Sequence, residues 1–385
     1  MKTMTIGIDV HSIGSRKGGN ETSYRELITG LSQLCSEHRF LLYHTNPIRA
    51  KDLALGRNFS LLRLFPGNPA LRIPFTMPWR ARQDRLDVFH AMYVLPPYLQ
   101  CKTVTTVADI AYEHFPKFFP AHELAWFKTM VPLSVRNSDH VITVSEYSKT
   151  DIARTYRIRE DKITVTHQGA GKQFFPRDKD VCKEQLARRY GIEGDFVLYL
   201  GRLQARKNLI GLVNAFARVH KGGLPHKLVL AGKIDSMFSP VLSRIRKLGL
   251  EQSVLMPGYI ADEDVPIFYN AADVFTYPSF FEGFGLPVIE AMACGTPVLT
   301  SRGSSLEEVA GDAAWLVEPS DEISIAETLR KALEDPELRA RMGQAGLTRS
   351  KMFSFRNAAR QTIAVYERMM GEEIGRAEKW QAAIR

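Results

Sequence analysis

The chain has 385 residues, which is enough for two domains of ordinary size with separate cores. Its hydrophobic content of 45% and charged content of 24% are typical of a soluble globular protein. There is no run of about 18 apolar residues to predict a membrane span, and the opening MKTMTIGIDV is too short for a signal peptide and predicts a strand. The cysteines have no metal-binding or redox spacing, so we expect reduced thiols in a cytoplasmic protein: Cys35, Cys101, Cys182 and Cys294.

The net charge of +9 belongs entirely to the first half of the chain. Residues 1–177 contain 24 Lys and Arg against 15 Asp and Glu, whereas residues 178–385 contain 27 of each. A nucleic acid, an anionic membrane face or a phosphorylated substrate would explain the excess, and so would a solvated basic surface.

In chain order, the first half alternates apolar runs with helical patterns, which predicts a parallel α/β sheet. Helices are expected at residues 21–35, 127–138 and 146–156, the last of them capped by Ser145. The predicted strands are residues 5–10, 39–45, 87–91, 102–109, 140–145 and 162–168.

The alternation then starts again, which predicts a second doubly wound domain. Gly, Pro and charge interrupt the periodicity at residues 169–180, so we place the joint there. A helical tail begins near Asp321 and contains residues 323–346 and 354–374. The predicted strands of this half are 195–203, 226–233, 253–259, 273–279, 296–301 and 313–318, with a helix at 207–220 after the first.

The stretch SFFEGFGLPVIEAMACGTPVLTS, residues 279–301, places glutamates on both sides of a predicted helix start. Pro287 fits the first helical position and Gly295 fits the residue past the end. The free N–H groups beside GFGL then favour an anion, and Gly283 and Gly285 allow close backbone approach.

The two glutamates have different predicted positions. Glu290 lies one turn inside the helix, where it could accept hydrogen bonds from vicinal hydroxyls such as those of a ribose, and Glu282 lies on the preceding loop within reach of a second polyol. Both could instead simply favour the positive end of a helix dipole.

A basic pair follows the first strand of the second half. In YLGRLQARKNL, Arg202 and Lys207 could neutralise a departing diphosphate, a task that a metal performs elsewhere. The alternative is a solvated basic loop, which is the interpretation we give Arg206. In the first half, Gly18 and Gly19 precede a helix, with Asn20 or Thr22 as the expected cap; paired glycines are usually only a turn.

Together these residues resemble the retaining glycosyltransferases of family 4, which have the two-domain GT-B fold. The stretch EGFGLPVIEAMACGTPVLTS resembles the E-x7-E motif of that family, and GRLQARKN resembles its Arg/Lys motif. The resemblance covers nearly the whole chain. It implies two Rossmann-like domains facing a cleft, an acceptor-side domain at 1–175 and a nucleotide-sugar domain at 176–361, with a helix at about 362–385 crossing back to the first.

The resemblance also implies a function: retaining, metal-independent transfer of a hexosyl unit from a nucleotide sugar, such as GDP-mannose or a UDP-sugar, to a glycan or lipid-linked acceptor in polysaccharide assembly. No bound cofactor and no metal ligand are expected. Arg202, Lys207, Glu282 and Asp109 would be catalytic. The donor would contact Gly18, Gly19, Arg202, Lys207, Tyr259, Ile260, Glu282, Gly283, Phe284, Gly285, Leu286 and Glu290.

One position departs from the family. Many relatives have His before the aspartate that here is Asp109, whereas this chain has Ala108, which cannot hydrogen-bond a sugar. An altered substrate, weaker activity or a substitute group would each explain it, and His114, His11 and His90 are the candidates for a substitute.

Other functions stay open. A non-catalytic nucleotide-sugar-binding partner subunit is the alternative from another class, and an epimerase or phosphorylase is the alternative among enzymes. No nucleic-acid-binding motif is present.

Residues 70–86 mix Arg72, Arg80, Arg82 and Arg85 with Phe75 and Trp79, and Pro74 and Pro78 disfavour a regular helix in the first half of this segment. This composition suits peripheral contact with an anionic membrane on the inner face of the plasma membrane, or a loop packed on the first domain.

Overall fold

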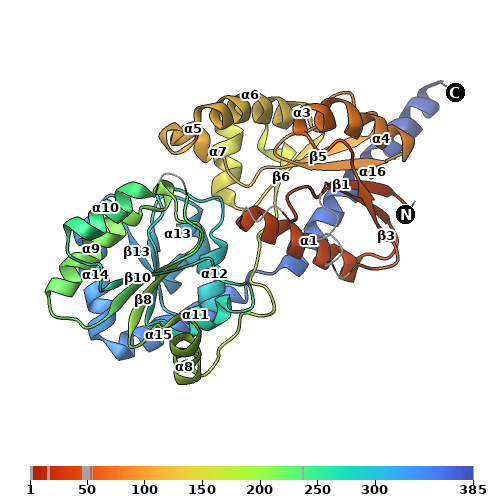
Figure 1. Cartoon of the computed structure of the whole chain (residues 1–385). Helices are drawn as coiled ribbons and strands as arrows, with labels where there is room; N and C mark the ends of the chain where they lie inside the picture. Colours follow the sequence, from red (N-terminus) through yellow and green to blue (C-terminus); the bar gives the residue numbers. More distant parts are fainter. Residues whose placement is uncertain (1–2, 15–17, 46–52, 54, 236–237, 385) are drawn as a thin grey trace. The chain divides into compact units, whose positions relative to one another are not determined.

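The computed structural model describes residues 3–14, 18–45, 53, 55–235 and 238–384, and of residues 372–384 it describes the backbone alone. The chain forms two compact units. The first contains residues 1–168 and 355–385, and the second contains residues 169–354. Figure 1 shows the elements of both units.

The first unit contains a parallel sheet of seven strands in the order β3-β2-β1-β4-β5-β6-β7. The chain order reverses between β1 and β4, which makes this a doubly wound sheet. A strand at 59–63 was not predicted. The strands are β1 (Thr5–Asp9), β2 (Arg39–His44), β3 (Phe59–Arg63), β4 (Val88–Met92), β5 (Lys102–Thr106), β6 (His140–Thr143) and β7 (Ile163–Val165).

Helices cover both faces of this sheet (Figure 1). The longer ones are α1 (Gly19–Leu34), α6 (Ala121–Asn137), α7 (Glu146–Tyr156) and α16 (Phe355–Ile384). Helix α7 is capped as predicted, because the Ser145 hydroxyl accepts from the Ser148 N–H at 3.1 Å. Shorter segments are α3 (Pro69–Leu71), the π-helical η1 (Arg72–Thr76), α4 (Met77–Gln83), α5 (Ala111–His114), η2 (Pro116–Phe118) and η3 (Glu160–Lys162).

Helix α16 packs against α1 and completes the core of the first unit. A side chain at Gly30 of α1 would meet Ala359 at 2.9 Å, so a glycine permits this close approach. Val365 and Tyr366 of α16 are buried in the same cluster. Residues far apart in the sequence therefore share one core.

The second unit contains a parallel sheet of six strands in the order β10-β9-β8-β11-β12-β13. Burial on both faces explains why strands such as FVLYL are continuously apolar. The prediction of two doubly wound α/β sheets is confirmed. The strands are β8 (Phe196–Leu200), β9 (Lys227–Ala231), β10 (Val254–Gly258), β11 (Val274–Tyr277), β12 (Val298–Ser301) and β13 (Trp315–Val317).

The helices of the second unit flank this sheet (Figure 1). They are α8 (Lys179–Tyr190), η4 (Ala205–Lys207), α9 (Leu209–Lys221), α10 (Ser239–Lys247), α11 (Val265–Ala271), α12 (Leu286–Ala293), α13 (Ser305–Ala310), η5 (Gly311–Ala313), α14 (Glu322–Glu334) and α15 (Pro336–Ser350).

The units divide at 168/169 and 354/355, which in both places is earlier in the chain than the expected 175/176 and 361/362. The reason at the first boundary is packing within the second unit. The Phe174 ring lies 5.9 Å from that of Tyr269, and the Asn270 side chain donates to the Phe175 carbonyl at 3.2 Å.

Candidate active site

The predicted basic pair and both glutamates lie at the carboxyl edge of the second sheet. Strand β8 leads into the loop and 3-10 turn that contain Arg202 and Lys207, and its neighbour β11 leads into the loop of Glu282. The chain order reverses between these two strands. Open α/β sheets bind ligands at such a switch point, outside the carboxyl ends of the strands.

Lys207 and Glu282 form a buried ion pair there. The Lys207 ammonium contacts the Glu282 carboxylate and also donates to the Tyr277 hydroxyl at 2.8 Å. Only 6% of Lys207 and 7% of Glu282 is exposed to solvent. Tyr277, at the end of β11, therefore joins the site, although the sequence analysis did not single it out.

Arg206 also belongs to this site, so its interpretation as a solvated loop residue was wrong. Its guanidinium lies 3.4 Å from the second oxygen of Glu282 and donates to the Phe281 carbonyl. The Phe280 N–H donates in turn to the Arg206 carbonyl at 3.1 Å, which ties the two loops together. The 3-10 turn directs this side chain inward, a direction that the sequence alone does not show.

These cations keep Glu282 ionised. Burial alone would raise the pKa of Glu282, but the charges of Lys207 and Arg206 outweigh burial and hold the pKa below its usual range. Two cations then face one carboxylate, so the buried group of Lys207, Arg206 and Glu282 carries one net positive charge.

Arg202 is placed differently from Lys207. Its guanidinium lies 2.8 Å from the Asp235 carboxylate, and its side chain is 44% exposed. The Gln204 amide also donates to Asp235, at 3.3 Å. Arg202 is therefore a half-exposed cation held by an acidic neighbour, not part of the buried pair.

The loop GFGL leads into α12 as the sequence predicts. Gly285 has φ +106° and precedes the helix, and a side chain there would meet Leu306 at 2.5 Å. Gly295 follows the helix with φ +78°. The Ser305 hydroxyl donates to the Glu282 carbonyl at 2.7 Å, and Gly283, Phe284 and Leu286 are buried. The start of α12 is thus fixed in place.

Glu290 lies in α12 and accepts a hydrogen bond of 3.0 Å from the Tyr269 hydroxyl. Tyr269 is completely buried, so its hydroxyl orients this carboxylate from the core of the second unit. Of the two residues expected beside a nucleobase, Tyr259 is 58% exposed and Ile260 is buried.

In the first unit, α1 begins at Gly19 with Gly18 as its cap and no side-chain capping bond, so the expected cap at Asn20 or Thr22 was wrong. A side chain at Gly18 or Gly19 would meet no atom of the described residues within 4 Å. Residues 15–17 of the same loop lie outside the described residues. Asp109 follows β5, and its carboxylate accepts from the Ala111 N–H at 3.0 Å.

Ala108 lines a hollow at the carboxyl edge of the first sheet. The hollow is small and open to solvent. Its polar lining includes Asn20, Ser23, Tyr24 and Thr106. The place of the missing imidazole is therefore bordered by hydroxyl and amide groups of the same unit.

The three candidate histidines have partners of their own. His11 lies 2.8 Å from Asp9, and His114 lies 2.8 Å from Asp151. His90 is completely buried, and its ring nitrogens lie 2.6 Å from the hydroxyls of Tyr366 and Thr106. Burial lowers the pKa of His90 to about 3, so its ring is neutral at physiological pH. Thr106 also lines the hollow, so its hydroxyl lies between His90 and the hollow.

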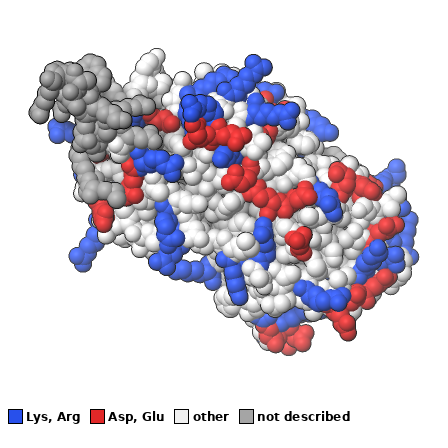
Figure 2. Space-filling view, turned by 180° about the vertical axis from the view of Figure 1, so that it is seen from behind, with Lys and Arg blue, Asp and Glu red and all other residues white. Residues whose placement is uncertain are grey.

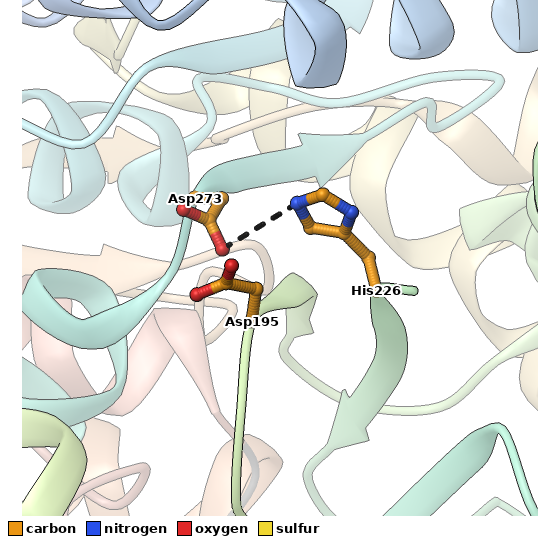
Figure 3. A group of neighbouring side chains, drawn as sticks. All are labelled: Asp195, His226 and Asp273. Carbon is orange, nitrogen blue, oxygen red and sulfur yellow. Dashed lines mark ion pairs between the residues drawn. The ribbon is translucent and has the colours of Figure 1, made fainter. Parts of the chain in front are cut away.

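One group among the described residues brings three possible metal ligands together: Asp195, His226 and Asp273, with ligand atoms within 4.8 Å of one another (Figure 3). Lysines already pair with both carboxylates, Lys183 with Asp195 and Lys179 with Asp273 at 2.7 Å. The group precedes β8, β9 and β11 and so lies at the amino edge of the sheet, opposite the site described above. We interpret it as a structural ion-pair cluster.

Known families match both halves of the chain. The family described as glycosyl transferases group 1 matches residues 183–349, and glycosyltransferase family 4 matches residues 17–170. The O-antigen chain mannosyltransferase B of Escherichia coli is 31% identical over 296 residues, which are 76% of this chain and 77% of that protein.

Two solved structures have the same fold. The sucrose-phosphate synthase of Thermosynechococcus elongatus is 21% identical with a TM-score of 0.80, covering 96% of this chain and 100% of that one. HepE of Anabaena, solved in complex with UDP-glucose, is 18% identical with a TM-score of 0.75, covering 94% and 99%. With two family models and a relative that align along most of its length, the chain belongs to the family 4 glycosyltransferases, which have the GT-B fold.

Proposed function

We propose that this glycosyltransferase moves a hexosyl unit, mannosyl in the first instance, from a nucleotide-diphosphate sugar to a glycan or lipid-linked acceptor in polysaccharide assembly. The observation that supports this most is the buried group at the switch point of the second sheet, in which two cations, Lys207 and Arg206, face the single carboxylate of Glu282. The similarity to an O-antigen mannosyltransferase favours mannose, and HepE shows that a protein of this fold binds a UDP-sugar.

In the proposed mechanism, the net positive charge around Lys207 and Arg206 stabilises the diphosphate as it departs. Fixed cations in a partly dry site are worth more against developing charge than they are in water. The half-exposed Arg202 adds a guanidinium fork suited to phosphate oxygens. Protein cations then do the work that a divalent metal does elsewhere, and we propose transfer with retention and without such a metal.

The two carboxylates have separate proposed roles. Glu290, oriented by Tyr269, binds the ribose hydroxyls, and Glu282 on the loop contacts the donor sugar. The exposed Tyr259 ring stacks on the base and Ile260 supports it from the core. The roles of Gly18, Gly19 and Asp109 in the first unit stay predictions. The four unpaired thiols fit a reducing compartment, so we place the enzyme in the cytoplasm.

Binding of nucleic acid has less support. On the face that Figure 2 shows, Lys and Arg side chains are interspersed with Asp and Glu and do not form one basic stripe. A protein that tracks a phosphate backbone concentrates its basic residues along the path of the strand.

A donor panel tests the proposal. The protein is heated with GDP-mannose, UDP-glucose, UDP-galactose or no ligand, and the panel is repeated with EDTA. We expect one donor to raise the unfolding midpoint, because a ligand that binds only the folded state stabilises by mass action, and we expect EDTA to leave the shift unchanged. Arg202→Ala should reduce the shift, because its guanidinium is proposed to bind the diphosphate, and its partly exposed side chain can be removed without emptying the core.

The reaction itself is then followed with the donor that binds. Proton NMR of the product reports whether the anomeric configuration of the donor is retained. Absence of stabilisation by every nucleotide sugar, with the protein folded, would contradict the proposal, and so would turnover that disappears with EDTA.

A further inference from the structure

Residues 69–83 form one continuous helical segment that exposes apolar side chains on its outer side. The segment consists of α3, η1 and α4, so the prolines interrupt it less than the sequence suggested. Pro74 lies in the π-helical turn, and Pro78 is the second residue of α4, so both prolines are accommodated within the segment. The inner side packs Ile73, Met77 and Ala81 against the sheet.

The outer side is the unusual one. Leu71, Phe75 and Trp79 are 48%, 67% and 60% exposed. Their spacing of four residues places them together on one face of a helix. A helix whose inner face is already packed normally presents polar residues outward, so these three residues are exposed without any role in the core. We call them the apolar stripe.

The charges beside the apolar stripe are almost all positive. Residues 69–85 contain four arginines and one acidic residue, Asp84. Asp84 pairs with Arg80 at 2.8 Å, and Arg72 is buried, so Arg82 and Arg85 are the exposed cations at the end of the segment.

A neighbouring helix extends this apolar character. In Figure 1, α3, α4 and α6 run along the same side of the first unit, and Met130 of α6 packs on the cluster that holds the inner side of α4. On α6, Trp126 is 42% and Leu133 is 47% exposed. The outer layer of the first unit thus presents two tryptophans.

We propose that the apolar stripe and the arginines Arg82 and Arg85 bind the first unit to an anionic lipid bilayer. Tryptophan and phenylalanine favour the headgroup region of a bilayer, and arginines beside them are attracted to anionic lipids. None of the described helices is long and apolar enough to span a bilayer, so the contact is one of surface insertion. The contact needs no transfer reaction, and vesicles that contain no saccharide test it separately from the proposed function.

The experiment measures sedimentation of the full-length protein with vesicles of phosphatidylcholine alone or with 30 mol% phosphatidylglycerol. We expect binding to the anionic vesicles only, and release as the salt concentration rises beyond 0.5 M, because screening weakens surface charge attraction. Insertion is read independently from tryptophan fluorescence, which should be quenched by brominated lipids.

Three variants separate the contributions. Phe75→Ser/Trp79→Ser should abolish most binding and most quenching, and Arg82→Glu/Arg85→Glu should weaken binding to anionic vesicles by at least 25-fold, since each arginine near such a surface is worth about fivefold. The control is Ile323→Ser/Met352→Ser, which removes two comparably exposed apolar residues of the second unit, 55% and 64% exposed, and should change nothing.

Equal binding to neutral and anionic vesicles would overturn the proposal, and so would no binding to either. A concentration-dependent dimer in light scattering, lost in Phe75→Ser/Trp79→Ser and accompanied by no vesicle binding, would assign the stripe to a second copy of the chain instead. Because all the substituted side chains are exposed, circular dichroism should show every variant folded.

Discussion

Replacing Lys207 by Met should destabilise the second unit. The substitution keeps a side chain of similar length but leaves Glu282 buried without its nearest cation. Removing one partner of a buried pair usually costs about 3–5 kcal/mol. Arg206 remains 3.4 Å from the other oxygen of Glu282, so we expect a loss of about 3 kcal/mol, near the lower end.

The assay is calorimetry or urea unfolding of the full chain, with the transition of each unit fitted separately because two units need not unfold as one. A loss of about 3 kcal/mol in a unit of this size corresponds to a fall in Tm of roughly 6–12 °C. Glu282→Gln/Lys207→Met removes both charges and should recover at least about 2 kcal/mol, which appears as coupling in a double-mutant cycle.

The pH dependence gives a second test of the same reasoning. In the wild type the pKa of Glu282 is lowered, so its pairing contributes stability above the unfolded pKa, and this is lost as pH falls through the folded pKa. In Lys207→Met burial should dominate and raise the pKa of Glu282. The stability deficit of the variant, which is its free energy of unfolding compared with that of the wild type, should then shrink as the pH is lowered from 7 to 5. Three results would refute the argument: a loss of stability below about 1 kcal/mol in Lys207→Met, effects of the two substitutions that simply add in the double mutant, or a stability deficit that does not change with pH.

Three further predictions follow from the two sites. Tyr269→Phe should weaken binding of the free nucleoside diphosphate about fivefold through loss of the hydrogen bond to Glu290; calorimetric titration beside Glu290→Gln measures it, and unchanged affinity would remove Tyr269 from the site. Burial lowers the pKa of His90 to about 3 from an ordinary 6.5, so at pH 5 this side chain is protonated in the unfolded chain but not in the folded one. Acidification from pH 7 to pH 5 should therefore lower the free energy of unfolding of the first unit by about 2 kcal/mol. Urea unfolding measures this loss, which should be absent in His90→Gln. Ala108→His adds an imidazole to the lining of the hollow and should raise hexosyl transfer severalfold in a product assay, whereas slower transfer with tighter donor binding would show that another group already does that work.

The parallel strands could be predicted because burial on both faces makes them continuous apolar runs. Strand β3 was missed because only its first residue is buried, so FSLLR has neither a continuous apolar run nor clean alternation. The helical segment at 69–83 was misjudged for the opposite reason. Proline was weighed as a helix breaker, although Pro74 and Pro78 both lie within helical turns of this segment.

The site could be predicted in its residue types but not in its pairings. Lys207 and Glu282 are 75 residues apart in the sequence, and only the adjacency of β8 and β11 brings them together. Arg206 and Lys207 are neighbours of the same charge, and the sequence does not show that both side chains point toward Glu282. The roles of the Tyr277 and Tyr269 hydroxyls could not be predicted either, because the sequence does not show which polar group a buried tyrosine hydroxyl will meet.

The packing of α16 on α1 has a consequence for synthesis of the protein. Because Ala359, Val365 and Tyr366 belong to the core of the first unit, that core stays open until residues beyond 355 have left the ribosome. The whole second unit, residues 169–354, emerges in the meantime, which takes on the order of 10–40 s at ordinary translation rates. The apolar face of α1, with Ile28 and Leu31, has no partner helix during this interval. The nascent first half is therefore the state of this enzyme most in need of a chaperone, and the second unit is free to fold before the first.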